Sequence, residues 1–135
     1  HRDLHSFPTR RSSDLAAALA TLEVMTDAHL QVWGAQQEAA IISRYERWRA
    51  QRLSPYLGRL TGVGAMRGIE LAQADGTPAP QQLTQLLGLA RAAGLLLMPS
   101  GKSRHIIRLL APLTIEPAVL EEGLDILQAC LKQLD

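Results

Sequence analysis

The sequence predicts an α+β domain, a small and mostly antiparallel sheet with helices on one face. Helical periodicity dominates 16–53 and the stretch after Pro117, and a further helical stretch at 81–93 follows a strand-like region at 60–72. Two apolar runs, 95–98 and 104–111, are separated by a short loop that favours an antiparallel pair. Packing helices on one side of such a sheet leaves its other face for a further domain.

Composition restricts the class of protein. The chain has 135 residues, of which 47% are hydrophobic and 20% charged, as expected for one soluble globular domain. Its single cysteine excludes an internal disulfide, and its histidines lack metal-ligand spacing. Residues 16–135 carry 11 basic and 11 acidic side chains, which leaves no charge pattern for nucleic acid or membrane. We therefore expect a cytoplasmic protein without a metal.

The first fifteen residues, HRDLHSFPTRRSSDL, have neither helical nor strand periodicity. Their back-translation matches a common short-read sequencing adapter along the whole stretch. We therefore expect 1–15 to be a non-native, disordered leader and exclude it from the fold. The domain is then 16–135, beginning within a longer native protein.

Two helices are predicted next. The Ala- and Leu-rich stretch 16–27 has a helical apolar period, and 28–53 follows it with a second apolar stripe. The second helix also carries arginines in its C-terminal half, namely Arg44, Arg47, Arg49 and Arg52. A phosphate-binding patch and a solvated helix face both fit this pattern, and the neutral body favours the solvated face.

The middle of the chain contains two weak phosphate-site signals. In the strand region, Gly62-Val63-Gly64 lacks the third glycine and the following helix of a dinucleotide fingerprint. Gly101-Lys102-Ser103 resembles the end of a P-loop, but Leu96 replaces the required leading glycine. Neither signal predicts a phosphate site.

Cap signals frame the last two helices. Gly94 follows the 81–93 helix at the position of a C′ cap, and Pro117 opens the last helix at an N1-like position. The last helix has an apolar stripe, formed by Leu120, Leu124, Leu127, Leu131 and Leu134. We expect Cys130 to be a core residue there, because no histidine lies near it in sequence to activate the thiol.

Arg108 interrupts the apolar run from His105 to Ile115. An unpaired, buried guanidinium is costly, so the arginine either reaches solvent or lies beside an anion. Periodicity alone favours the solvent-facing arginine.

Several motifs together resemble class III aminotransferases. Residues 62–71 (GVGAMRGIEL) are similar to the family's RGxGLMxGIEL signature, and 91–97 (RAAGLLL) to its ARxxGLLL segment. Residues 107–115 (IRLLAPLTI) are similar to IRLLPPLTI, and 122–127 to the EGLDIL that follows it. Residues 16–25 resemble the helix between the two domains of that family.

The resemblance implies the C-terminal small domain of a fold type I enzyme that uses pyridoxal 5′-phosphate. Such enzymes are usually homodimers, and their Schiff-base lysine and most cofactor contacts lie in the large domain. We therefore expect no catalytic and no cofactor-binding residue in this chain, no binding of the cofactor to it, and no activity by itself. Lys102 matches no lysine motif of the family.

The resemblance assigns Arg108 to a substrate carboxylate, as in 4-aminobutyrate aminotransferases. It implies transfer of an amino group from an ω-amino acid to 2-oxoglutarate. Acetylornithine, diamine and other ω-amino donors remain alternatives, as does a standalone α+β binding module without catalysis. Thr61 and Ala111 depart from the family, which usually has Arg and often Pro there, and this puts the local strand geometry in doubt.

Overall fold

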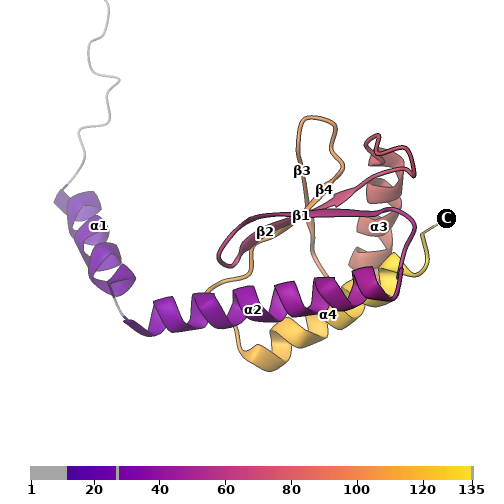
Figure 1. Ribbon diagram of the computed structural model, residues 1–135. Helices are drawn as coiled ribbons and strands as arrows, with labels where there is room; N and C mark the ends of the chain where they lie inside the picture. The colour runs from indigo at the N-terminus through magenta and orange to yellow at the C-terminus, as the bar shows by residue number, and fades with distance from the viewer. Residues whose placement is uncertain (1–11, 27, 135) are drawn as a thin grey trace, which may run out of the picture. The chain divides into compact units, whose positions relative to one another are not determined.

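The computed structural model describes residues 12–26 and 28–134, which form two compact units divided after Val32. The element order is α1 (Ser12–Met25), α2 (Ala28–Ala50), β1 (Leu57–Val63), β2 (Met66–Leu71), α3 (Pro80–Ala92), β3 (Met98–Ser100), β4 (Ile106–Leu109) and α4 (Pro117–Leu131). These elements are labelled in Figure 1.

The first unit contains α1, whose start differs from the expectation. The helix begins at Ser12, so Ser12–Leu15 are helical where a disordered leader was expected. Residues 1–11 lie outside the described residues, and the non-native origin of 1–15 stays a prediction. The predicted apolar stripe of α1 is exposed, with Leu19 at 63% and Leu22 at 56%.

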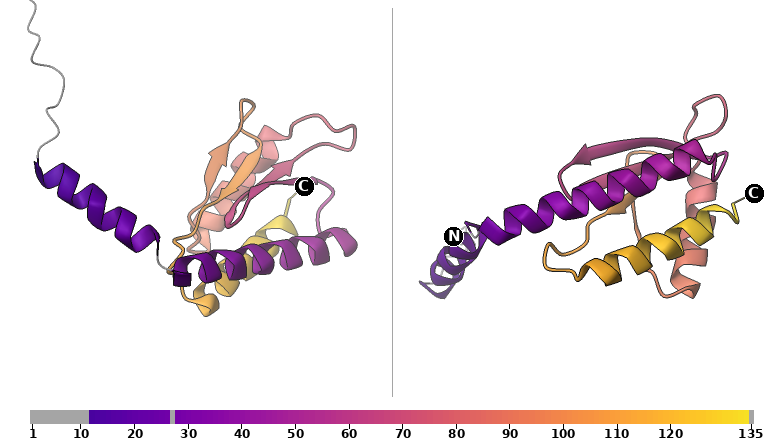
Figure 2. Two further views of the ribbon diagram at one scale, coloured as in Figure 1. Left: turned by 60° about the vertical axis from the view of Figure 1, so that its left-hand side comes forward. Right: turned by 60° about the horizontal axis from the view of Figure 1, so that its bottom comes forward.

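The second unit, from Trp33 onward, is the predicted α+β layer. Its four strands are all antiparallel and lie in the order β1-β2-β4-β3. Ile69 and Ile107 point from the central strands into the core and are fully buried. There they join buried side chains of α2, α3 and α4, represented by Trp48, Leu83 and Leu127. Figures 1 and 2 show α2 and α4 running along the same side of the sheet.

The predicted strand region at 60–72 is a hairpin of β1 and β2, and the boundary between the two strands was not predicted. Val63 pairs with Met66 across a two-residue turn at Gly64 and Ala65. Gly64 has a φ of 58°, which favours glycine and reverses the chain there. Both strands carry small and apolar residues in alternation, so periodicity did not locate the turn between them.

The third strand begins later than predicted. Of the predicted run at 95–98, only Met98 lies in β3 (Met98–Ser100), because Leu95 belongs to the cap of α3. Its N–H donates to the Ala90 carbonyl at 2.8 Å, and Gly94 has a φ of 88°. This is the Schellman closure, and it confirms the predicted C′ glycine.

The remaining element boundaries follow the predictions to within a few residues. The helix expected at 28–53 ends at Ala50, and the strand expected at 104–111 is the shorter β4 (Ile106–Leu109). The last helix begins at Pro117 as predicted, and its leucine stripe faces the core.

Candidate functional site

A row of four residues crosses the sheet on the face opposite the helices. The register pairs Thr61 with Gly68, Gly68 with Arg108, and Arg108 with Met98, so the row takes one residue from each strand. Directly paired residues of an antiparallel sheet project to the same face. Arg108 therefore lies between a glycine on β2 and a methionine on β3.

Strand alternation exposes Arg108. Its neighbour Ile107 points into the core and is fully buried, so the following side chain projects to the uncovered face. No hydrogen bond or ion pair joins the Arg108 guanidinium to any residue in 12–26 or 28–134. The solvent-facing orientation favoured by periodicity is confirmed, and the guanidinium remains available to an anion.

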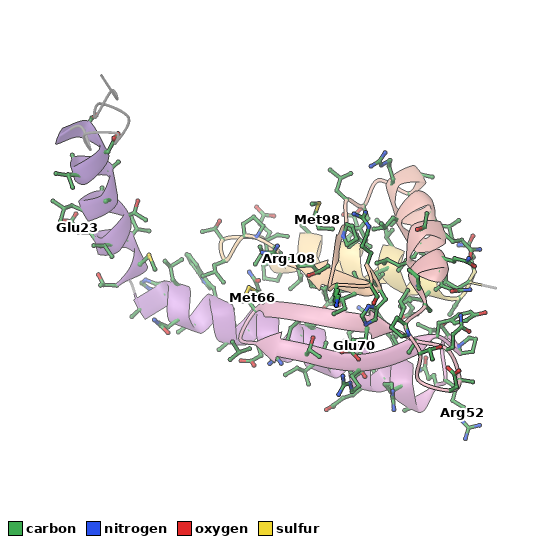
Figure 3. All side chains as sticks on the ribbon, turned by 90° about the horizontal axis from the view of Figure 1, so that it is seen from above. Glu23, Arg52, Met66, Glu70, Met98 and Arg108 are labelled. Atoms are coloured by element: carbon green, nitrogen blue, oxygen red, sulfur yellow. The ribbon has the colours of Figure 1, made fainter. Side chains whose placement is uncertain are left out.

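Exposed apolar side chains lie on the same face of the sheet as Arg108. Met98, its direct partner on β3, is 66% exposed, and Val63 and Met66 near the β1–β2 turn are 75% and 50% exposed. Figure 3 shows Arg108, Met98 and Met66 in the same region of the molecule, with Glu70 further along β2. Apolar side chains exclude water around a guanidinium, and its attraction to a bound anion is stronger where water is excluded.

A groove of about 440 Å³ opens beside Arg108 where the chain enters β3 and leaves β4. Residues 95–98, 108–112 and the first half of α4 supply most of its lining. Of the described residues that line it, Arg108 is the one with a charged side chain. The site therefore combines one free cation with an apolar wall.

Glu70 is a nearby anion on the same face, but it is already paired. Its carboxylate accepts hydrogen bonds from Arg59 at 2.9 and 3.1 Å. These bonds hold the pKa of the Glu70 carboxyl below its ordinary value, so the group stays ionised and paired at neutral pH.

Arg67 precedes Gly68 of the row in sequence, but its contacts stabilise the fold. It donates to the Gly64 and Gly62 carbonyls at 2.9 and 2.8 Å, and it forms an ion pair with Glu38 of α2. Sequence reasoning missed this residue. The signal was present, because alternation along β2 puts position 67 on the same face as Ile69.

The arginines of α2 do not form a phosphate patch. Arg44 forms ion pairs with Glu121 and Asp125 of α4, which raise the pKa of the arginine further. Arg49 donates to the Leu57 and Gly58 carbonyls at 3.3 Å. These two arginines join α2 to its neighbours, whereas Arg47 and Arg52 are exposed.

The residues present do not fit pyridoxal phosphate. The cofactor requires a lysine, and the two lysines of the sequence are both exposed, Lys102 in the β3–β4 turn and Lys132 after α4. Neither lines the groove beside Arg108. Cys130 is a buried core residue as expected, and burial raises the pKa of its thiol, which opposes formation of a nucleophilic thiolate.

Two features are absent from the described residues, 12–26 and 28–134. None of their helices has the length and apolar character to cross a membrane. They also contain no group of three or more His, Cys, Asp or Glu residues arranged to hold a metal ion.

The chain matches the profile of a known protein family. The profile of the class-III aminotransferases covers residues 12–131. That span includes β1 to β4 and the row containing Arg108.

Two relatives show how similar the chain is to characterised enzymes. It is 72% identical over 120 residues to the 2-aminoadipate transaminase of Pseudomonas putida. It is 38% identical over 120 residues to the 4-aminobutyrate aminotransferase of Mycobacterium tuberculosis. These matches cover 89% and 88% of the chain but only 29% and 26% of the two enzymes.

A solved structure matches the chain with similar partial coverage. The chain matches an Arthrobacter phospholyase in complex with phosphoethanolamine with a TM-score of 0.78 and 29% identity. The match covers 89% of this chain and 28% of that one. The chain therefore spans less than a third of the relatives it matches.

Proposed function

The chain belongs to the class-III aminotransferases, and we propose that it is the substrate-carboxylate-binding part of a larger transaminase. That enzyme moves an amino group between an amino acid and a keto acid. Family membership over 12–131 supports the reaction class, and the coverage of less than a third of each relative supports a larger parent. A homodimeric, cytoplasmic parent is part of the same proposal.

Class-III aminotransferases depend on pyridoxal phosphate, which supplies the electron sink for chemistry at the amino-bearing carbon. Because neither lysine of this chain fits that cofactor, the proposal places its attachment in the rest of the parent. The contribution of this chain is then to bind and orient the substrate.

The unpaired guanidinium of Arg108 carries the proposal. Arg108 projects from the uncovered sheet face, has no partner among the described residues, and has exposed apolar neighbours. A guanidinium binds a carboxylate through two parallel hydrogen bonds and keeps its charge at any working pH. Such a bidentate contact fixes the reacting carbon of the substrate and so contributes to rate.

The relatives suggest the donor. We propose 2-aminoadipate as the amino donor and 2-oxoglutarate as the acceptor, because the relative named for 2-aminoadipate is 72% identical. The sequence favoured 4-aminobutyrate, and the relative named for that substrate is 38% identical. 4-Aminobutyrate therefore remains the second candidate. Both donors carry a carboxylate that Arg108 can bind.

The test is a donor comparison with the complete parent enzyme and its cofactor. Glutamate formed from 2-oxoglutarate is measured with 2-aminoadipate or 4-aminobutyrate as donor. We expect kcat/KM for 2-aminoadipate to exceed that for 4-aminobutyrate by about tenfold or more. A reversed preference restores the donor favoured by the sequence. No glutamate from either donor contradicts the proposed function.

A further inference from the structure

Gly68 lies beside Arg108 in the row that crosses the sheet. On β3, Arg108 faces the side chain of Met98, but on β2 it faces a residue without a side chain. One strand further, Thr61 lies about 10 Å from Arg108, since neighbouring strands are about 4.8 Å apart. The residue paired with Arg108 on β2 therefore places no side chain of its own beside the guanidinium.

The space above Gly68 is taken by two neighbouring side chains. A Cβ at position 68 would lie 2.9 Å from Cγ2 of Ile106 and 2.9 Å from Oγ1 of Thr61. Real Cβ atoms essentially never approach other atoms this closely. Thr61 also donates a hydrogen bond to the Gly68 carbonyl at 3.1 Å, which holds its side chain over β2.

Backbone conformation does not explain this glycine. Gly68 is absent from the glycines with positive φ, so an alanine can adopt its backbone angles. The glycine is required for space. Ile106 is two residues before Arg108 on β4 and projects to the same face, so a displaced Ile106 crowds the arginine.

We propose that Gly68 is a positioning residue for the substrate carboxylate. Without a side chain, it gives Ile106 and Thr61 room to pack over β2, whereas an added Cβ would push Ile106 toward the guanidinium that binds the carboxylate. This inference rests on the proposed function of Arg108. It states that Gly68, which is paired with Arg108, controls the position of the guanidinium that binds the carboxylate.

The test uses the complete holoenzyme and a defined quantity, the carboxylate ratio. This ratio is kcat/KM for 2-oxoglutarate divided by kcat/KM for propanal, an acceptor without a carboxylate. We expect Gly68→Ala to lower the carboxylate ratio about tenfold through KM for 2-oxoglutarate, since a small displacement at a positioning contact has a large effect on rate. Gly88→Ala is the matched control, because a Cβ at position 88 of α3 meets no atom within 4 Å.

A double variant separates positioning from general damage. If Gly68 acts through Arg108, Gly68→Ala combined with Arg108→Met lowers the carboxylate ratio no further than Arg108→Met does. Additive losses, or equal losses for propanal and 2-oxoglutarate, overturn the inference. If Gly68→Ala does not yield folded holoenzyme, Thr61→Ile is the second variant. It adds bulk over Gly68 from β1, and an unchanged carboxylate ratio in this variant also overturns the inference.

Failure of this inference is distinguishable from failure of the proposed function. If Arg108→Met itself leaves the carboxylate ratio unchanged, the role of Arg108 is wrong. If Arg108→Met lowers the ratio and Gly68→Ala does not, only the role of Gly68 is wrong.

Discussion

Arg67 and Arg108 lie on adjacent strands, and opposite faces of the sheet give them different roles. Arg67 faces α2, where its side chain is 12% exposed and bonded to Glu38 and two carbonyls. Arg108 faces outward and has no bonded partner in the described part of the chain. An arginine whose bonds are all made within the fold stabilises it, whereas one left open on an apolar surface can bind a ligand.

Cys130 provides a prediction at the residue scale. Burial raises the pKa of its thiol, so the thiolate forms more readily in the unfolded chain. The protonated, buried thiol therefore contributes its full stabilisation of the fold at pH values below the ordinary thiol pKa. This contribution is lost as the pH rises through the raised pKa of the folded protein. At pH 8 we expect iodoacetamide to modify Cys130 at least about a hundredfold more slowly in the native enzyme than in urea.

Mass spectrometry of the peptide that contains Cys130 measures both rates. Equal rates in native and urea-treated enzyme would show that the side chain is accessible, against its 2% exposure in the structure.

The role of a single residue was predictable where its neighbours in sequence determine its environment. Cys130 and Gly94 were assigned correctly because a helix period and a helix end are local properties. Periodicity also oriented Arg108. The partners of Arg67 and Arg44 come from distant segments, so no local pattern distinguished these two bonded arginines from Arg108.

At the scale of elements, α2 and α4 are joined by polar contacts above the core. Arg44 bridges Glu121 and Asp125, and the Trp48 indole donates to Gln128 at 2.7 Å. Apolar burial alone permits helices to slide along each other, whereas these contacts fix one alignment. The alignment matters for the site, because the first half of α4 lines the groove beside Arg108.

We expect Arg44→Met to loosen α4. Two carboxylates lose their partner, which costs about 2 kcal/mol and corresponds to about 30-fold faster amide exchange in α4 if the helix opens locally. Hydrogen exchange of the complete enzyme, read by mass spectrometry on α4 peptides, measures this.

The control is Arg47→Met, which removes an exposed arginine of the same helix that has no ion pair among the described residues. Its α4 exchange should stay within about twofold of the wild type. Faster exchange in both variants would trace the effect to α2 itself and not to the bridge.

Element boundaries were less predictable than element types. The turn inside the β1–β2 hairpin was not located because a two-residue turn hardly interrupts alternation, and the start of β3 was misplaced because the α3 cap uses Leu95. Both errors lie where a hydrogen bond outside the strand or a positive φ decides the boundary.

At the scale of the whole molecule, one face of the sheet is covered by helices and the other is not. The uncovered face of the second unit exposes apolar side chains, among them Val63, Met66 and Met98. A surface of this kind is typical of an interface, and the sequence predicted a free face for a further domain. We propose that the rest of the parent enzyme covers it and brings the substrate to Arg108.

The fold class was predictable because helix periods and two close strand runs restrict the architecture strongly. The family was predicted from motifs at 62–71 and 107–115, and the family match over 12–131 confirms it. The donor was not predictable, because the one carboxylate contact proposed for this chain, Arg108, suits several amino acids.

The central claim is that Arg108 binds a substrate carboxylate. The most direct measurement is the carboxylate ratio of the complete enzyme carrying Arg108→Met, beside Arg91→Met, which removes an exposed arginine on α3. We expect Arg108→Met to lower kcat/KM for 2-oxoglutarate about a hundredfold and to change that for propanal by less than about twofold, while Arg91→Met changes neither. Equal losses for both acceptors, or no loss for 2-oxoglutarate, would contradict the account.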